Sequence, residues 1–331
     1  MKLVSYLKNK EQSLGVIVRE KLYNLASMEA NFPSDILTFL DHGEPAMQSL
    51  REKTAQLING AITASPESDF QLIAPVPHPR SCRDGYAFRQ HVAAARRNRG
   101  VEMIKEFDQY PVFYFTNHQA IQGPGDIFCM PDHFQQLDFE LEVAIVIGKQ
   151  GKNIQAKDAD GYIAGFTIMN DMSARKLQME EMLLNLGPAK GKDFSTIIGP
   201  WLVTPDELKP FLVPPKNGHI GNNYNLSMKC WVNNQLVSEG NMSDMDWTFA
   251  EIIERCSYGV TLYPGEVIGS GTVGTGCFLE LNGTGMLHNP DYQPQWLKEG
   301  DVVKMTIDGL GALENTIRAE QTDWSILALK K

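Results

Sequence analysis

Two glutamates occupy alternate positions of an otherwise apolar segment, LDFELEVAIVIG, residues 137–148. Side chains two residues apart in a β-strand point to the same side of the sheet, so Glu140 and Glu142 should aim in one direction. Adjacent buried carboxylates repel each other, and one of them takes up a proton unless a cation lies between them. On a half-exposed strand the same pattern would simply face water. The pattern alone leaves both interpretations open.

Two aspartates lie in segments that could bring further carboxylates to the same place. Asp84 lies in SCRDGYAFRQH, and Asp171 follows the apolar run GFTIMN. No CxxC pair or paired-histidine pattern accompanies these acidic residues. Carboxylate oxygens without such partners favour a hard cation, Mg²⁺, Ca²⁺ or Mn²⁺, over zinc. Asp84, Glu140, Glu142 and Asp171 are therefore candidate ligands of one divalent cation.

Three other polar residues could take part in chemistry, but each also has a purely structural interpretation. His91 could be a hydrogen-bonded core histidine, Lys192 in GPAKGKDF a solvated loop lysine, and Glu280 in CFLELNG an exposed strand residue. The preceding glycine-rich run, GSGTVGTG, is expected to continue into a strand over CFLEL. Nucleotide-binding fingerprints need a helix at that point, so neither of them applies.

Short β-rich runs dominate the chain from about residue 130 onward. The Asn-Asn pair in WVNNQLV predicts a tight hairpin turn. We expect helices around residues 84–97, 173–185 and 246–256, the last of them capped by Ser243. Many strands, few helices and the absence of a βαβ rhythm predict an α+β, mainly β fold.

Residues 1–70 are expected to form a small α+β unit that precedes a main domain over residues 71–331. LGVIVRE and KLYNLAS predict a hairpin, and SDILTFLDHG and EPAMQSLREKTAQLING predict two helices. FQLIAPVPHPR then reads as a strand interrupted by prolines. A chain of 331 residues is long enough for one large domain with such an appendage.

Composition excludes several classes of function. The net charge of −10 and the pI of about 5.2 argue against a general nucleic-acid binder. No apolar run approaches the ~20 residues that cross a bilayer, and MKLVSYLKNKEQ lacks the apolar core of a signal peptide. Five scattered cysteines fit reduced thiols better than a disulfide framework. We therefore expect a cytoplasmic protein without membrane or nucleic-acid partners.

Several of these segments together resemble the fumarylacetoacetate hydrolase family. The matching motifs follow the family's order between about residues 75 and 318: LDFELEVA, GFTIMNDMSARKLQ, LGPAKGKDFSTIIGPW, GSGTVGTGCFLEL and GDVVKMTIDGLGALENTI. RDGYAFRQHV, with Tyr86 and His91 five residues apart, is similar to the longer, fumarylacetoacetase-type branch. The resemblance implies a mixed β-roll main domain and a homodimer.

The resemblance also implies a role for each candidate residue. It assigns Asp84, Glu140, Glu142 and Asp171 to the metal, with Thr196 supporting the metal site. It makes His91 the general base, oriented by Glu280. It places three groups against developing negative charge: Arg175, Gln178 and Lys192. It gives three residues contacts to substrate: Tyr86, Thr272 and Arg99.

The activity implied first is metal-dependent hydrolysis of a carbon–carbon bond in a β-diketo acid such as fumarylacetoacetate, a step of tyrosine and homogentisate breakdown. Isomerisation or decarboxylation of a related 2-oxo acid in aromatic degradation is the alternative, and a non-catalytic binding protein on the same fold is a third. Two departures from the family bear on the substrate. Met172 stands where the family often has tryptophan, and FYFTNHQAIQGPGDIF lacks a lysine that many acylpyruvate-cleaving members carry.

Overall fold

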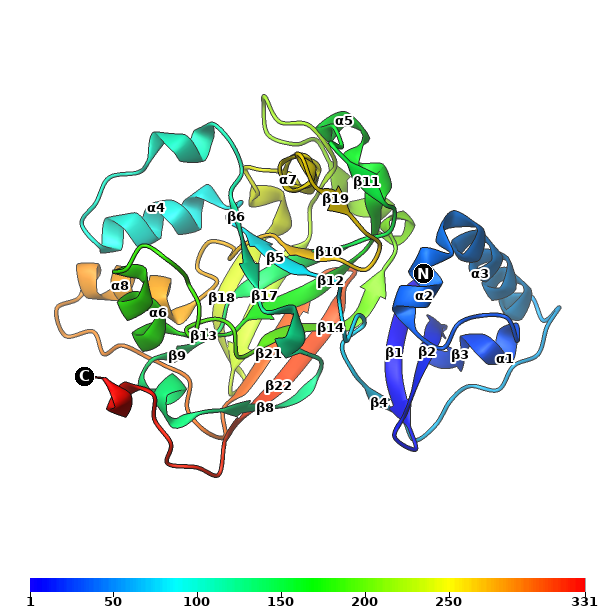
Figure 1. Ribbon diagram of the computed structural model, residues 1–331, viewed down its shortest axis with the longest axis horizontal. Helices are drawn as coiled ribbons and strands as arrows, with labels where there is room; N and C mark the ends of the chain where they lie inside the picture. The colour runs from blue at the N-terminus through cyan, green and yellow to red at the C-terminus, as the bar shows by residue number, and fades with distance from the viewer. Residues whose placement is uncertain (331) are drawn as a thin grey trace.

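An N-terminal unit of strands and helices lies to one side of the body of the computed structural model, which describes residues 1–330 (Figure 1). The predicted hairpin and both predicted helices are confirmed. Asp35 caps the first of these helices, because its side chain accepts a hydrogen bond from the Thr38 N–H at 2.9 Å. The elements of this unit are β1 (Lys2–Lys8), β2 (Glu11–Val18), β3 (Lys21–Asn24), α1 (Leu25–Met28), α2 (Ile36–Asp41) and α3 (Gly43–Ile58).

The N-terminal strands extend the main sheet of the body. β1 pairs with β2 on one side and with β14 on the other, in the registers Lys2↔Ile17 and Lys2↔Val203. The strand order is β3-β2-β1-β14-β12-β10-β20-β5-β6, with β4 beside β1 and β7 beside β14. The domain boundary after residue 70 stays a prediction, because one sheet runs through both parts. The other strands of this sheet are β4 (Gln71–Leu72), β5 (Cys82–Gly85), β6 (Phe113–Thr116), β7 (Ile121–Gln122), β10 (Leu141–Ile147), β12 (Ile163–Asp171), β14 (Thr196–Val203) and β20 (Val267–Gly269).

A second sheet of five strands packs against the first, in the order β18-β17-β21-β22-β8. The predicted Asn-Asn hairpin joins β17 to β18. Asn233 and Asn234 both have positive φ, 51° and 66°, as a type I′ turn requires. The strands are β8 (Gly125–Cys129), β17 (Ser227–Val232), β18 (Gln235–Asn241), β21 (Val302–Ile307) and β22 (Gly311–Ala319). Short pairs lie outside both sheets: β9 (Leu137–Asp138) with β13 (Ser173–Ala174), β11 (Gly151–Lys152) with β19 (Thr261–Leu262), and β15 (Leu212–Val213) with β16 (Asn223–Tyr224).

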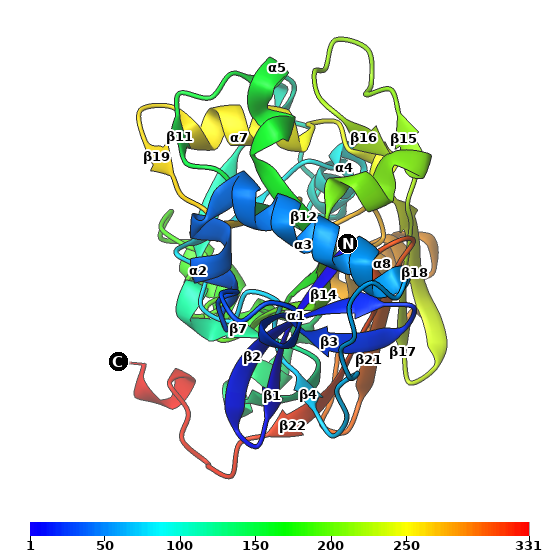
Figure 2. The ribbon, with the colours of Figure 1, turned by 90° about the vertical axis from the view of Figure 1, so that its right-hand side faces the viewer.

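Strand β10 is buried on both faces, which explains its unbroken apolar run. Val143 and Ile145 belong to the core between the two sheets, whereas Ala144 and Val146 belong to the core under α2 and α3. Figure 2 shows α3 crossing above the N-terminal strands. Glu142 lies on the same side of β10 as Ala144, but it joins no apolar core. The alternation in the sequence therefore marks where the core gives way to a polar site.

The described part of the body carries five α-helices: α4 (Arg89–Asn98), α5 (Ala156–Ala159), α6 (Arg175–Met182), α7 (Phe249–Ser257) and α8 (Phe278–His288). The helices expected near 84–97, 173–185 and 246–256 are present with shifted ends. Asp84 belongs to β5 rather than to the first of them. Thr248, not Ser243, caps α7, because its hydroxyl accepts from the Glu251 N–H while the Glu251 carboxylate accepts from the Thr248 N–H.

The strand expected over CFLELNG is wrong, since these residues open helix α8. Their apolar alternation was short, and short apolar runs do not distinguish a strand from a buried helix. Glycines inside α8 allow close packing: a Cβ on Gly283 would overlap the side chain of Asn98 in α4. The reason for excluding a nucleotide loop, that no helix follows GSGTVGTG, is therefore also wrong.

The predicted α+β, mainly β class is confirmed by the two packed sheets and the separate helices. FQLIAPVPHPR forms only the two-residue strand β4. Among the described residues, none of the helices has the length and apolar character needed to cross a membrane.

Candidate metal and active site

Four carboxylates converge at one end of the main sheet. Ligand atoms of Asp84, Glu140, Glu142 and Asp171 all lie within 4.8 Å of one another, and all four residues are buried. Asp84 lies on β5, Glu142 on β10 and Asp171 at the end of β12, while Glu140 lies just before β10 rather than within it. The alternative in which the glutamates face water is therefore wrong.

Gly269 makes room for this cluster. It ends β20, which lies between β10 and β5, and pairs with Ala144 on one side and Asp84 on the other. A Cβ at this position would overlap Asp84 Oδ1 and lie 3.0 Å from Glu142 Oε2. Gly269, the first residue of the glycine-rich run, thus lets the backbone approach two carboxylates.

The donor set fits a hard divalent cation. Glu142 Oε2 and Asp171 Oδ1 are buried oxygens without a hydrogen-bond partner among the described residues, and such orphaned acceptors are costly. Burial, reinforced by Asp171, raises the pKa of Asp84 to about 7. Burial and the neighbouring Asp84 raise the pKa of Glu142 well above its usual value. A bound cation would relieve both penalties, because it satisfies the oxygens and favours their ionised form.

Two buried cations border the acidic cluster. The Lys192 ammonium donates to Asp171 Oδ2 at 2.8 Å and also contacts Glu140, while Arg175 Nη2 donates to Glu140 Oε1 at 2.8 Å. Burial opposes the charge on Lys192, but Asp171 and Glu140 outweigh it and raise the pKa of the amine. Burial likewise opposes ionisation of Glu140, but Lys192 and Arg175 lower the pKa of this carboxyl to about 2. Fixed positive charge is thus held beside the candidate metal ligands.

Metal binding should depend on pH. In the metal-free protein the pKa of Asp84 is raised from 3.8 to about 7, so its proton stabilises the fold most at low pH, and this contribution is lost as the pH rises through the raised pKa. A cation must displace that proton. Below the raised pKa, the affinity for the cation should therefore fall about tenfold for each unit that the pH is lowered, per proton displaced.

We expect Mn²⁺ to raise the melting temperature of the protein more at pH 8 than at pH 6 in a thermal-shift assay. Equal shifts in wild type, or an unchanged difference in Asp84→Asn, would contradict this expectation.

His91 and Glu280 form a buried pair next to the cluster. His91 Nδ1 lies 2.6 Å from Glu280 Oε2, although the two residues come from α4 and α8. A ring nitrogen of His91 also lies within 4.8 Å of a Glu140 oxygen and of the Cys277 sulfur. A carboxylate that accepts from one imidazole nitrogen fixes the tautomer and leaves the other nitrogen free to take a proton. The pair can therefore act as an oriented base beside the cation site.

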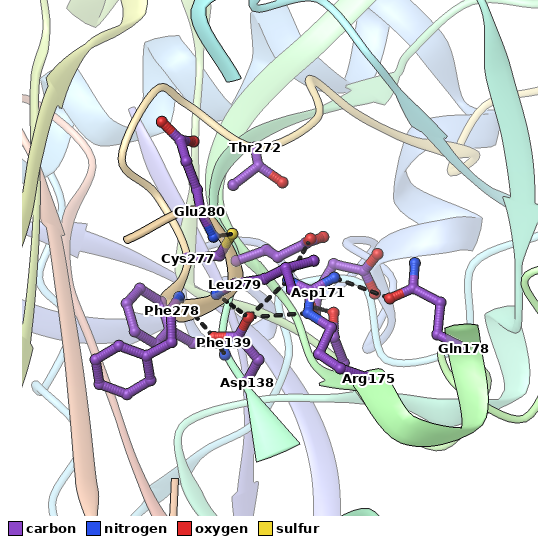
Figure 3. A network of polar contacts seen from close by, with 12 residues as sticks. Asp138, Phe139, Asp171, Arg175, Gln178, Thr272, Cys277, Phe278, Leu279 and Glu280 are labelled. Atoms are coloured by element: carbon purple, nitrogen blue, oxygen red, sulfur yellow. Dashed lines mark hydrogen bonds and ion pairs between the residues drawn. The ribbon is translucent and has the colours of Figure 1, made fainter. Parts of the chain in front are cut away.

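Asp138 is a buried carboxylate to which the sequence analysis gave no role, and it links both parts of the site. Its Oδ2 accepts from Arg175 Nε at 2.9 Å and from the Leu279 N–H at 2.9 Å, while its Oδ1 accepts from the Phe278 N–H at 2.8 Å (Figure 3). The two amides are the first of α8, the helix that carries Glu280. Free N–H groups at a helix start favour a negative partner. Asp138 therefore positions Arg175 and the helix of the His91 pair together.

Asp138→Asn should loosen this arrangement without removing a candidate metal ligand. We expect about 1–3 kcal/mol lower unfolding free energy, because a buried charged acceptor loses part of its bonds. Turnover should fall while the stoichiometry of Mn²⁺ binding stays the same. Urea unfolding and Mn²⁺ titration measure the two effects. Asp132→Asn is a matched control, because Asp132 is also buried and accepts from the N–H groups of Ile326 and Leu327 outside this site. If Asp132→Asn loses as much turnover per folded molecule as Asp138→Asn, the positioning role of Asp138 is refuted.

Tyr114 is a second residue that the sequence did not single out. Its hydroxyl donates to Asp171 Oδ2 at 2.5 Å, and burial together with Asp171 raises its pKa well above the usual value. A phenol at that place stays protonated, so it can donate to an oxygen. Its signal in the sequence was only the alternation of FYFT, where Tyr114 follows Phe113 on β6 and lies across from Asp84 in the β5–β6 pairing.

A cavity of about 660 Å³ opens onto the cluster. Gln178 Oε1 accepts from Arg175 Nη1 at 3.0 Å, and Thr272 Oγ1 lies 3.4 Å from Glu142 Oε1. Thr196 lies opposite Asp171 in the β12–β14 pairing and does not line the cavity. Glu142, Asp171 and Glu280 lie behind its wall. The predicted residues that line it are Asp84, Tyr86, His91, Arg99, Glu140, Arg175, Gln178, Lys192 and Thr272.

The chain is similar in sequence to several known proteins. A family model described as fumarylacetoacetate (FAA) hydrolase C-terminal matches residues 81–318. The chain is 33% identical, over 301 residues covering 89% of this chain and 83% of the relative, to a mitochondrial oxaloacetate tautomerase of Bos taurus. It is 30% identical to a fumarylacetoacetate hydrolase domain-containing protein 2 homolog of Dictyostelium discoideum, over 324 residues covering 96% and 97%.

Solved structures confirm the predicted fold. A fumarylacetoacetate hydrolase from Exiguobacterium antarcticum superposes with a TM-score of 0.68 at 24% identity, covering 97% of this chain and all of that one (100%). A maleylpyruvate hydrolase from Sphingobium, solved with manganese(II) and pyruvate, gives 0.68 at 21% identity with the same coverage, 97% and 100%.

Proposed function

Since this chain belongs to the fumarylacetoacetate hydrolase family, we propose that it is a metal-dependent enzyme that interconverts the keto and enol forms of a 2-oxo acid such as oxaloacetate. This gives isomerisation, the alternative in the sequence analysis, precedence over fumarylacetoacetate hydrolysis. Three relatives that are 33%, 32% and 32% identical to this chain over 301 residues are named oxaloacetate tautomerases. The observation that carries the proposal is the buried four-carboxylate cluster with His91 beside it.

The side chains supply what enolisation needs. His91 can take the proton from the carbon next to the 2-oxo group, because Glu280 holds its Nδ1 side and leaves Nε2 free. Lys192 and Arg175 lie where they can stabilise the enolate oxygen or the carboxylate of the substrate. The imidazolium then gives this proton to the enolate oxygen, which completes the enol, and the two transfers in reverse regenerate the keto form, so no water enters the reaction. A divalent cation held by Asp84, Glu140, Glu142 and Asp171 would act as a Lewis acid that polarises the 2-oxo group.

Mg²⁺, Mn²⁺ and Ca²⁺ all suit these oxygen ligands, and we propose Mg²⁺ or Mn²⁺ as the working ions. Both are small enough for a compact, octahedral carboxylate site. Arg99 and Tyr86, which line the cavity, are proposed to contact substrate, and Thr196 to support the metal ligands from behind.

The test compares two reactions of one metal-loaded sample. Enol oxaloacetate should disappear faster with enzyme than without it, as followed by its ultraviolet absorbance, and EDTA should abolish the difference. Fumarylacetoacetate and acylpyruvates should give no cleavage products at a comparable rate. Cleavage without enol–keto interconversion would refute the proposal and restore hydrolysis.

Carbon–carbon hydrolysis stays a second candidate because of one observation, the 2.6 Å contact between His91 and Glu280. An imidazole oriented by a carboxylate can also activate water. Hydrolysis and enolisation both pass through an enolate, so one site can favour either. A product assay with β-diketo acids distinguishes them. Metal binding with neither activity would favour the third possibility, a binding protein.

We further propose a homodimer in the cytosol, without nucleic-acid or membrane partners. The five cysteines are free and buried, which suits a reducing compartment. Names of several relatives specify mitochondria, so cell fractionation decides the compartment. Light scattering of the purified protein tests the dimer, and a monomeric mass would refute it.

A further inference from the structure

The cavity has two chemically different ends. Its inner end is lined by two of the candidate metal ligands, Asp84 and Glu140, together with Arg175, Lys192 and His91. Its outer part is bordered by apolar side chains, among them Val112, Met179, Met182, Leu279, Met286 and Trp296. A polar substrate would leave these side chains in contact with water.

Helix α6 carries this gradient from charged to apolar, and α8 lines the cavity with a similar spacing. On α6, Gln178, Met179 and Met182 lie three, four and seven residues after Arg175, so the four residues share one face. At about 1.5 Å rise per residue, that face extends about 10 Å from the guanidinium to Met182. The same spacing recurs on α8, where Leu279, Asn282, Gly283 and Met286 all line the cavity.

The outer part is poor in charged groups. Among the lining residues that the structure describes, Arg99 is the charged side chain outside the inner end, and it is exposed. Its Nε already donates to the Ala95 carbonyl at 3.0 Å. At the mouth, Met182 and Met286 are 40% and 51% exposed. This leaves apolar surface for a ligand to cover.

The volume indicates a substrate larger than oxaloacetate. Drug-sized ligands occupy cavities of roughly 300 to roughly 1000 Å³. This cavity, at about 660 Å³, lies in the middle of that range. A small 2-oxo dicarboxylate would occupy the inner end and leave the apolar part empty. Methionines suit a flexible apolar chain, because they adapt their shape to it.

We propose that the enzyme acts on 2-oxo acids that carry an apolar substituent several carbons long. The 2-oxo carboxylate binds at the inner end, and the substituent lies between α6 and α8 against Met179 and Met286. This inference rests on the proposed 2-oxo acid chemistry and specifies its substrate class.

The test uses inert analogues, oxamate and its N-alkyl derivatives from ethyl to hexyl, with the Mn²⁺-loaded protein in calorimetry. Each buried methylene should tighten binding about fourfold. Met179→Gln and Met286→Gln keep side-chain length but add a polar amide, and each should flatten the dependence of affinity on chain length. Leu287→Gln is the matched control, since Leu287 neighbours Met286 on α8, is 56% exposed and does not line the cavity. It should leave the dependence unchanged.

The outcomes separate this inference from the proposed function. If oxamate binds and oxaloacetate is tautomerised, but alkyl chains add no affinity, the inference alone is refuted. An N-carboxyalkyl oxamate that binds more tightly than the N-alkyl one of equal length, with the gain lost in Arg99→Gln, would also overturn it. If neither oxamate nor oxaloacetate interacts with the metal-loaded protein, the proposed function itself fails.

Discussion

Glu142→Gln should lose about a thousandfold in metal-dependent turnover, and yet the metal-free variant should be at least as stable as wild type. The carboxylate is buried, one of its oxygens has no hydrogen-bond partner in the described chain, and its neighbours Asp84, Glu140 and Asp171 repel it. The amide removes that repulsion and a metal ligand together. Loss of about 4 kcal/mol of Lewis-acid stabilisation corresponds to this rate. Melting temperatures with EDTA and with Mn²⁺, together with kinetics, measure both effects.

The control for Glu142→Gln is a variant that neutralises a carboxylate outside the site. Asp160→Asn suits this purpose, because Asp160 is half-buried and accepts from the Asn222 N–H at 2.9 Å, outside the cavity. It should keep the Mn²⁺-induced shift and turnover. If Glu142→Gln retains both the shift and the activity, the carboxylate cluster is not the metal site.

His91→Gln should keep metal binding and lose about 10²–10⁴ in turnover, the usual contribution of a positioned general base. Glutamine can retain a hydrogen bond to Glu280, so the fold should persist, but it cannot take a proton. The Mn²⁺ thermal shift and the single-turnover rate measure these two properties. Glu280→Gln should be less severe, since it removes the orientation of the imidazole and leaves the imidazole itself.

The His91 prediction has a clear counter-result. Full turnover in His91→Gln would assign the proton transfer to another group. Lys192 and Tyr114 would then be the candidates, because both contact Asp171 of the cluster. A variant that binds no Mn²⁺ would instead make His91 part of the metal site, as its distance to Glu140 would allow.

The sequence predicted the part of the site that local spacing encodes. The alternation in LDFELEVA predicted that Glu140 and Glu142 aim at one place, and they do, although Glu140 lies just before the strand rather than within it. The end of GFTIMN predicted Asp171 at a strand terminus, as the structure shows. The Asn-Asn turn was readable because two adjacent residues with positive φ have few alternatives. The resemblance to a family paired His91 with Glu280, which are 189 residues apart and share no local pattern.

Features that depend on distant partners could not be predicted. Asp138 binds the amide of Phe278, 140 residues later, and that of Leu279, and these contacts help to make CFLELNG a helix instead of the expected strand. Tyr114 is one of several aromatic residues in its strand, and only the fold brings its hydroxyl to Asp171. In the first case tertiary hydrogen bonds accompany a helix where the local pattern favoured a strand; in the second, the local pattern does not tell which aromatic residue reaches the site.

Hydrolysis and isomerisation could not be separated from these residues either. Both reactions need an oriented base, fixed positive charge and a Lewis acid, because both pass through an enolate. The motif residues do not restrict the size or polarity of the substrate, whereas the apolar outer part of the cavity favours an apolar substituent.

The most direct test of the central claim is a titration of EDTA-treated protein with Mn²⁺ while enol–keto interconversion of oxaloacetate is followed. Activity should rise from the uncatalysed rate and level off at one ion per chain, and Glu142→Gln should stay at the uncatalysed rate throughout. Full activity in the metal-free protein, or equal activation of Glu142→Gln, would contradict the account.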